Sequence, residues 1–172
     1  MAASTTTTTA GGGATGVAVP GAEPGHAQSA ARAMLDRDPA SSALGMALVD
    51  ESPGRAVVTM TVRPDMLNGF AIAHGGLVFA LADTAFAAAC NEDECVTVAA
   101  GAEISYLRPA REGQTLTATA ERRIRTGRSG LYDVRVTDDA GEVVAEFRGR
   151  SRTLRRAPRP DDRDQPGTGV HG

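Results

Sequence analysis

One carboxylate stands in the middle of an apolar stretch of this sequence. Asp83 lies within the run LVFALADTAFAAAC, residues 77–90, which holds no other charged side chain. An unpaired carboxylate is costly to bury, so it needs either a partner or a function. If the run is helical, the residues four positions away, Phe79 and Ala87, offer no basic partner. Two interpretations stay open here: a structural Asp paired with a more distant group, and a catalytic carboxylate.

The segment NGFAIAHGG, residues 68–76, precedes this run and brings Asn68, His74 and Gly75 to its start. The first N–H groups of a helix have no partner within the helix, and the helix dipole favours negative charge at that end. Such an end can stabilise the oxyanion that develops when a carbonyl carbon is attacked. The alternative interpretation is a glycine-rich turn in which His74 caps the helix or packs as a neutral imidazole.

Gly75 and Asp83 are too far apart to act on one substrate within one chain. They are eight positions apart, which is about 12 Å along a helix with a rise of about 1.5 Å per residue. A reacting carbonyl must lie within about 3 Å of both the oxyanion donor and the nucleophile. A working site would therefore combine Gly75 of one subunit with Asp83 of another. Two such helices, antiparallel across a two-fold axis, would create two equal sites.

The elements that must hold these residues are one buried helix and a set of antiparallel strands. The run from Gly76 to residue 90 is apolar nearly all round, too long for one strand and rich in helix formers, which indicates a buried helix. Residues 26–38 predict a short amphipathic helix that ends before Pro39. Strands are expected in two segments joined by a Ser-Pro-Gly turn within residues 44–63, and then at residues 96–109, 115–127, 129–139 and 142–154.

One face of the expected sheet is apolar and needs a cover. The alternating pattern places the apolar side chains of two strands on one face, namely Leu116, Ala118, Ala120 and Ile124, and Val143, Ala145 and Phe147. The apolar helix is the available cover, which predicts an α+β hotdog fold, an antiparallel β-sheet wrapped around a central α-helix. Residues 25–154 form this domain, while residues 1–24 and 155–172 are expected to be disordered tails because they lack core-forming side chains.

Bulk properties exclude several classes of protein. A chain of 172 residues with a net charge of -3 is one domain without the basic surface that nucleic acid requires. Its two cysteines provide neither a disulfide framework nor a zinc site, so we expect a reduced, cytoplasmic protein without a metal. The sequence also shows no secretory signal and no apolar run of membrane-spanning length, which predicts no membrane partner.

Residues 40–152 closely resemble the phenylacetate-degradation thioesterase family (PaaI). The resemblance lies in the segment that runs from Asn68 through His74 and Gly75 to Asp83, and in the later segments AEISYLRP, GQTLTATAE and GRSGLYDV. The resemblance implies a hotdog fold and homodimers that assemble into homotetramers. It also implies hydrolysis of an acyl-CoA thioester without a metal or redox cofactor, coenzyme A being part of the substrate. An aryl- or hydroxyphenylacetyl-CoA substrate is suggested by the resemblance alone.

The resemblance also assigns roles to four residues of this sequence. It makes Asn68 an amide that orients substrate or water, His74 a positioning imidazole, and the Gly75 N–H the donor to the thioester oxygen. Asp83 becomes the nucleophile or the general base, two roles that the sequence does not separate.

Arginines near the strand ends are candidates for binding the phosphates of coenzyme A. Guanidinium groups suit phosphate oxygens, so we expect Arg108, Arg125 and Arg128 to form a cluster for this purpose. The alternative is a solvated strand face. Two other functions stay open on this fold: an enoyl-CoA hydratase-like enzyme, and a non-catalytic acyl-CoA sensor. A sensor would signal to a DNA-binding domain, but the tails show no helix-turn-helix pattern, and Asp83 favours catalysis over sensing.

Overall fold

A computed structural model describes residue 1, residues 29–93 and residues 95–154. The expected tails fall outside this part of the chain, apart from residue 1, so the predicted domain boundaries stay predictions. The elements are α1 (Ala30–Leu35), α2 (Pro39–Ala43), β1 (Ala47–Ser52), β2 (Arg55–Thr61), a 3-10 turn (Pro64–Met66), α3 (Gly75–Cys90), β3 (Thr97–Tyr106), β4 (Thr115–Thr126), β5 (Ser129–Thr137) and β6 (Val143–Thr153).

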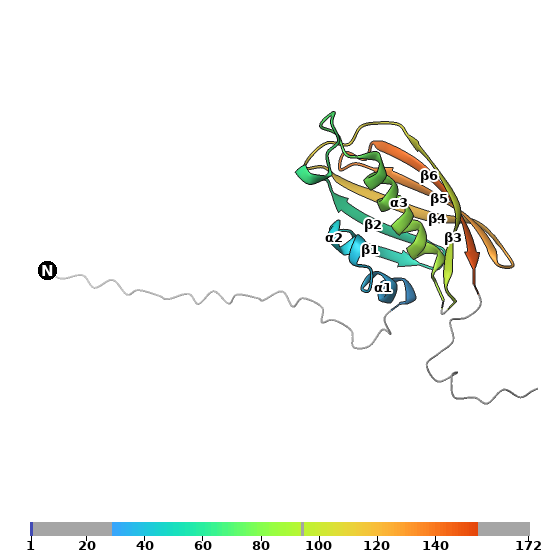
Figure 1. The fold of residues 1–172 in the computed structure, drawn as a ribbon. Coiled ribbons are helices and arrows are strands. Elements are labelled where there is room, and N and C mark those ends of the chain that lie inside the picture. The colour runs from blue at the N-terminus through green and yellow to red at the C-terminus, as the bar shows by residue number, and fades with distance from the viewer. Residues whose placement is uncertain (2–28, 94, 155–172) are drawn as a thin grey trace, which may run out of the picture.

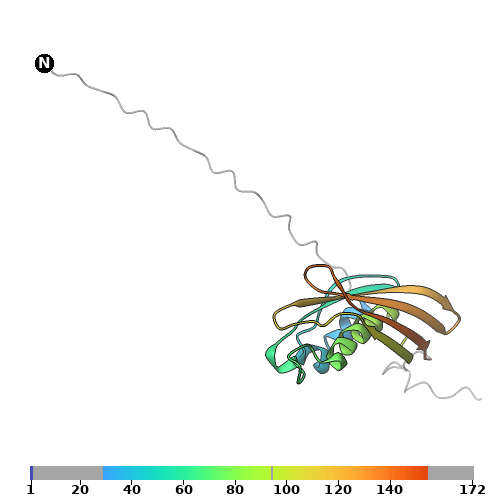
Figure 2. The same ribbon diagram turned by 90° about the horizontal axis from the view of Figure 1, so that it is seen from above.

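The six strands form one antiparallel sheet in the order β1-β2-β4-β5-β6-β3. The long helix α3 lies across one face of this curved sheet, and α1 and α2 lie beside it near β1 (Figures 1 and 2). This arrangement is the predicted α+β hotdog. No helix in the described part of the chain combines the length and apolarity needed to cross a membrane.

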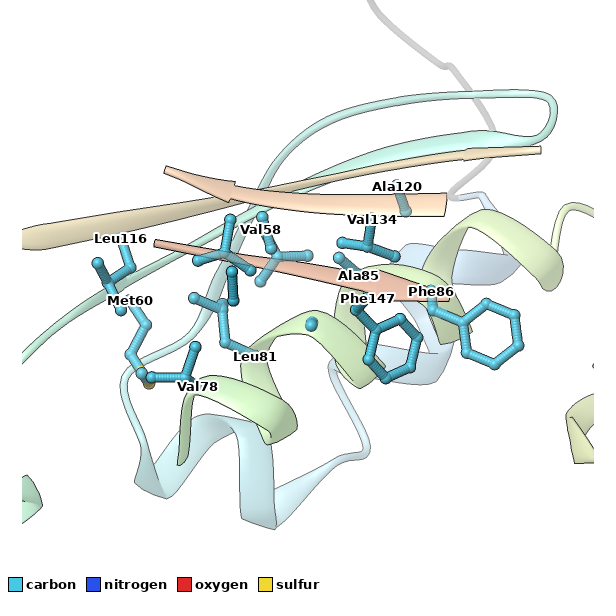
Figure 3. Close-up of a cluster of buried hydrophobic side chains, with 14 of the residues drawn as sticks. Val58, Met60, Val78, Leu81, Ala85, Phe86, Leu116, Ala120, Val134 and Phe147 are labelled. Atoms are coloured by element: carbon cyan, nitrogen blue, oxygen red, sulfur yellow. The ribbon is translucent and has the colours of Figure 1, made fainter. Parts of the chain in front are cut away.

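The core fills the space between α3 and the sheet. Figure 3 shows helix side chains, among them Leu81 and Phe86, packed against side chains from the strands. The Phe86 ring contacts the rings of Tyr132 and Phe147, with centroid distances of 5.4 Å and 5.9 Å. A Cβ added at Gly149 would come within 2.9 Å of the Phe86 ring. A glycine at this position of β6 therefore lets the helix approach the sheet closely.

The segment before β1 forms two short helices rather than one. As predicted, the first helix ends before Pro39, but Pro39 then begins α2, at a position where proline needs no helix partner for its nitrogen. The Asp38 side chain accepts hydrogen bonds from the N–H groups of Ala40 and Ser41 and caps this second helix. The Ser41 hydroxyl also lies 3.2 Å from the hydroxyl of Thr84, which ties α2 to α3.

The prediction that Ile124 belongs to the buried face is wrong. The pairing of β4 with β5 shifts register between Arg122 and Ile124, and the side chain of Ile124 is 58% exposed. A bulge of this kind moves the following side chains to the other face of the sheet. A similar shift in β6 buries Val144, while Val143, which was expected in the core, is only partly buried.

Candidate active site

The start of α3 is held by His74, the residue before the first helical position. Its Nδ1 atom accepts a hydrogen bond from the Gly76 N–H at 3.1 Å, so the imidazole caps the helix. Its own backbone N–H donates to the Met66 carbonyl at 2.9 Å. The geometry therefore shows the capping role, one of the two that the sequence left open for His74. The two hydrogen bonds of His74 hold the backbone on both sides of Gly75.

Gly75 keeps a free backbone donor. Within residues 29–93 and 95–154, no acceptor reaches its N–H, whereas its carbonyl accepts a hydrogen bond from the Tyr106 hydroxyl at 2.8 Å. The free N–H stands at the positive end of the helix dipole. This is the arrangement that an oxyanion hole requires. Tyr106 was not among the residues predicted for the site.

The loop before the helix is built around the side chain of Asn68. Its Oδ1 atom accepts from the Phe70 N–H at 2.9 Å, and its backbone N–H donates to the Ile72 carbonyl at 2.8 Å. Ala71, inside this loop, has a left-handed backbone with φ of 57°. These bonds occupy the oxygen of the Asn68 amide and leave its NH₂ group without a partner among the described residues. A free NH₂ group fits the predicted role of orienting substrate or water.

A cavity of about 480 Å³ opens beside this helix start. Its lining brings together three of the predicted residues, Asn68, Gly75 and Arg108, the last at the β3–β4 connection, with Tyr106. Most of the remaining wall is apolar: Ile72, Ala73, Val78, Leu107, Pro109, Ala110 and Val144. Gly75, whose N–H has no acceptor among the described residues, therefore lies in largely apolar surroundings, where a carbonyl oxygen would meet little competition from water.

Asp83 lies apart from this cavity, about two helical turns further along α3. Its side chain is partly buried, and nothing in the described residues forms a hydrogen bond or ion pair with it. Burial raises the pKa of its carboxyl group above the usual value. Eight residues of helix separate it from Gly75, which is about 12 Å. The structure thus brings Asn68, His74 and Gly75 together and leaves Asp83 at a distance from them.

The cysteine on the same helix, Cys90, offers no better nucleophile. Cys90, at the end of α3, is buried, and burial raises the pKa of its thiol to about 12. A cysteine acts as a nucleophile through its thiolate, which a raised pKa suppresses. Among the residues that the structure describes, no group of three or more His, Cys, Asp or Glu side chains is placed to hold a metal ion.

The three candidate arginines do not gather at one point of this chain. Arg108 lines the cavity at the helix start and forms an ion pair with Glu142. Arg125 lies near the far end of β4 and Arg128 in the turn between β4 and β5, so the length of β4 separates both of them from Arg108. Arg125 binds Glu92 at 2.8 Å, and Arg128 Nε donates to the Thr153 carbonyl at 3.0 Å.

Comparisons with known proteins show the family to which this chain belongs. Residues 70–145 match the thioesterase superfamily. The acyl-coenzyme A thioesterase PaaI of Escherichia coli (strain K12) is 45% identical over 124 residues, which cover 72% of this chain and 89% of that protein. This chain belongs to the PaaI family of thioesterases. The solved structure of the E. coli PaaI protein matches 73% of the present PaaI-family chain and 91% of its own, with a TM-score of 0.71.

Two further structures extend the comparison of this PaaI-family chain. The phenylacetic acid degradation protein PaaI of Thermus thermophilus, solved as a mutant, is 38% identical. The match covers 68% of this chain and 100% of that protein, with a TM-score of 0.66. A hypothetical thioesterase protein of Streptococcus pneumoniae TIGR4, crystallised with coenzyme A, is 25% identical and matches 67% of this chain and 91% of its own, with a TM-score of 0.63.

Proposed function

We propose that this PaaI-family chain is an acyl-CoA thioesterase that hydrolyses an aryl- or hydroxyphenylacetyl-CoA to the free acid and coenzyme A. One observation carries the proposal. Within the described part of the chain, the same helix holds a Gly75 N–H without an acceptor, at a residue that lines an apolar cavity, and, further along, an unpaired Asp83 carboxylate whose pKa is raised. An oxyanion donor and a carboxylate that acts as nucleophile or general base are groups that can hydrolyse a thioester. The acyl group is inferred from the PaaI relatives, whose names place them in phenylacetic acid degradation.

In the proposed mechanism, the thioester carbonyl oxygen accepts a hydrogen bond from the Gly75 N–H, and the helix dipole stabilises the charge that develops on this oxygen. The Asn68 NH₂ group orients the substrate or the attacking water. Asp83 of the partner subunit either attacks the carbonyl carbon or takes a proton from water, whose oxygen then forms the new C–O bond. The C–S bond breaks, and coenzyme A leaves as a thiolate. If Asp83 is the nucleophile, water then hydrolyses the acyl-Asp83 anhydride, which releases the acid and restores the carboxylate.

The active unit is proposed to be a homodimer, which assembles into a homotetramer as the resemblance implies. The distance of about 12 Å between Gly75 and Asp83 along α3 supports a shared site, because one carbonyl carbon cannot contact both groups of one chain. An isologous two-fold contact would pair each Gly75 with the partner's Asp83 and create two equal sites.

Coenzyme A is proposed to bind along the cavity mouth, where Arg108 is placed to meet one of its phosphates. The coenzyme A in the Streptococcus structure supports this ligand for the fold. The proposed reaction requires neither a metal nor a redox cofactor. The two free cysteines fit the proposed cytoplasmic location.

The proposal is tested with the purified 172-residue protein and a panel of aryl-, arylacetyl-, hydroxyphenylacetyl-, short-chain and long-chain acyl-CoA esters. Thiol release is followed with a disulfide dye. We expect the highest kcat/KM for the aromatic esters. No thiol release from any ester would refute the thioesterase. Hydration of an enoyl-CoA without thiol release would indicate the hydratase instead, and tight ester binding without turnover would indicate a sensor.

A further inference from the structure

The peptide groups on either side of Gly75 form hydrogen bonds, whereas its own N–H has no acceptor in the described part of the chain. The His74 N–H donates to the Met66 carbonyl, the Gly76 N–H donates to the His74 imidazole, and the Gly75 carbonyl accepts from the Tyr106 hydroxyl. Two of these bonds are local, within ten residues of Gly75. The bond from Tyr106 is different, because Tyr106 lies 31 positions away in the sequence, at the end of β3.

The ring of Tyr106 also packs against Gly75. A Cβ added at Gly75 would lie 3.1 Å from the ring carbon Cζ, 3.3 Å from the hydroxyl oxygen and 3.4 Å from Cε1. Any side chain at this position would therefore require the ring to shift by a few tenths of an ångström. The ring lines the same cavity as Gly75 and Asn68, although about half of Tyr106 is exposed to solvent.

A glycine at the first helical position needs such a support. Without a Cβ, glycine rotates about φ and ψ more freely than any other residue, so bonds to the neighbouring peptide groups must set the direction of its N–H. An oxyanion donor contributes to catalysis only when it already points to where the charge develops. Tyr106 limits Gly75 twice, through the hydrogen bond to its carbonyl and through ring contact on its open side.

We propose that Tyr106 is a positioning residue that holds the Gly75 N–H in the direction of the thioester oxygen and forms one wall of the carbonyl pocket. The proposal rests on the thioesterase function proposed above. Tyr106 acts through Gly75 and not on the reacting atoms. Loss of the Tyr106 hydroxyl should therefore destabilise the transition state, in which the thioester oxygen is charged, more than the bound substrate.

The first test is Tyr106→Phe, which keeps the ring and removes the hydroxyl. We expect kcat to fall about fivefold to tenfold, the effect of one lost hydrogen bond, with KM nearly unchanged. The matched control is Tyr132→Phe, which also removes one phenol hydroxyl, next to the Phe86 ring near the other end of α3. This control should keep kcat at the wild-type value. An unchanged kcat in Tyr106→Phe would overturn the proposal, as would an equal fall in both variants.

A second test uses the contact between the ring and Gly75. Gly75→Ala keeps the N–H but pushes the Tyr106 ring, so kcat should fall. The double variant Gly75→Ala/Tyr106→Leu removes the ring atoms that the new Cβ meets. Its loss of kcat should therefore be smaller than the product of the two single losses, because residues in contact are not additive. Multiplicative losses would show that the two residues act independently.

A third readout does not depend on turnover. In protein labelled with ¹⁵N-glycine, Tyr106→Phe should move the amide signals of Gly75 and Gly76 more than those of any other glycine, since the hydroxyl bonds to the carbonyl between them. Unmoved signals would contradict the positioning role. If the wild-type protein releases thiol from no ester, the proposed function fails, while these signals still decide whether Tyr106 holds Gly75.

Discussion

Replacement of Asp83 by Asn tests the chemistry of the carboxylate with little change of shape. Asn keeps the size and most hydrogen-bonding groups of Asp and removes its charge. No described residue pairs with the Asp83 carboxylate, so Asp83→Asn breaks no ion pair within the described part of the chain. It also removes the free-energy penalty of burying a charge. The folded protein should therefore be as stable as wild type or more stable at neutral pH.

The activity of Asp83→Asn should fall by at least about a hundredfold in kcat, which corresponds to about 2.7 kcal/mol of lost transition-state stabilisation. Substrate binding should persist, because the acyl and CoA contacts are unchanged. The matched control is Asp139→Asn, which removes a carboxylate from an exposed turn and should keep wild-type kcat. Turnover near wild type in Asp83→Asn would show that Asp83 is a structural carboxylate.

The stability difference between Asp83→Asn and wild type should depend on pH in a defined direction. Burial raises the pKa of Asp83 above 3.8, so the native state binds this proton more tightly than the unfolded chain. The free energy of unfolding of wild type therefore falls as pH rises through the raised pKa. The advantage of the Asn variant is full above that pKa and disappears below about pH 3.8. Denaturant unfolding at several pH values measures it, and an advantage that grows at low pH would refute the buried-charge argument.

Two further predictions concern the cavity and the core. Arg108→Ala should raise KM for the CoA ester with little change in kcat, as expected for lost uniform binding, while Arg37→Ala, an exposed arginine in a turn, should leave KM unchanged. An unchanged KM in Arg108→Ala would remove this residue from the CoA site. Gly149→Ala places a Cβ 2.9 Å from the buried Phe86 ring and should lower the free energy of unfolding by about 1–3 kcal/mol. Gly69→Ala, whose Cβ would meet nothing within 4 Å, is the control in the same urea titration, and equal stability of the two variants would contradict the close packing at Gly149.

Periodicity predicted most of the fold because its signals are local. The uninterrupted apolar run predicted α3, and alternation with intervening turn residues predicted all six strands. The bulge that exposes Ile124 could not be predicted in this way. An inserted residue turns the side chains that follow it to the other face of the sheet, but it leaves the composition of the strand unchanged. The split of the segment before β1 depends on Asp38 capping a second helix at Pro39, a signal that the sequence contains and that the prediction of one helix passed over.

The site was predictable where its residues are neighbours in the sequence. Asn68, His74 and Gly75 lie within eight consecutive positions, so the loop and helix start that unite them follow from one motif. Tyr106 reaches Gly75 only because the end of β3 meets the start of α3, a contact between distant segments that no spacing reveals. The arginines were expected together, but the length of β4 separates Arg108 from the other two.

The central claim is that each site combines Gly75 of one subunit with Asp83 of its partner. The direct measurement mixes Asp83→Asn with Gly75→Pro, each inactive alone. Proline lacks the N–H and is accepted at the first position of a helix. Gly75→Ala, which adds a Cβ but keeps the N–H, controls for the contact with Tyr106. Native mass spectrometry verifies that the subunits exchange, and thiol release measures the activity.

Each shared site takes Gly75 from one subunit and Asp83 from the other. After random exchange of equal amounts of the two variants, a site is intact when the first subunit has an unmutated Gly75 and the second an unmutated Asp83. This should occur in about a quarter of the sites, so the mixture should regain about a quarter of wild-type activity. A site contained within one chain would never be restored by mixing. Exchanged subunits that are no more active than the two variants alone would contradict the shared site.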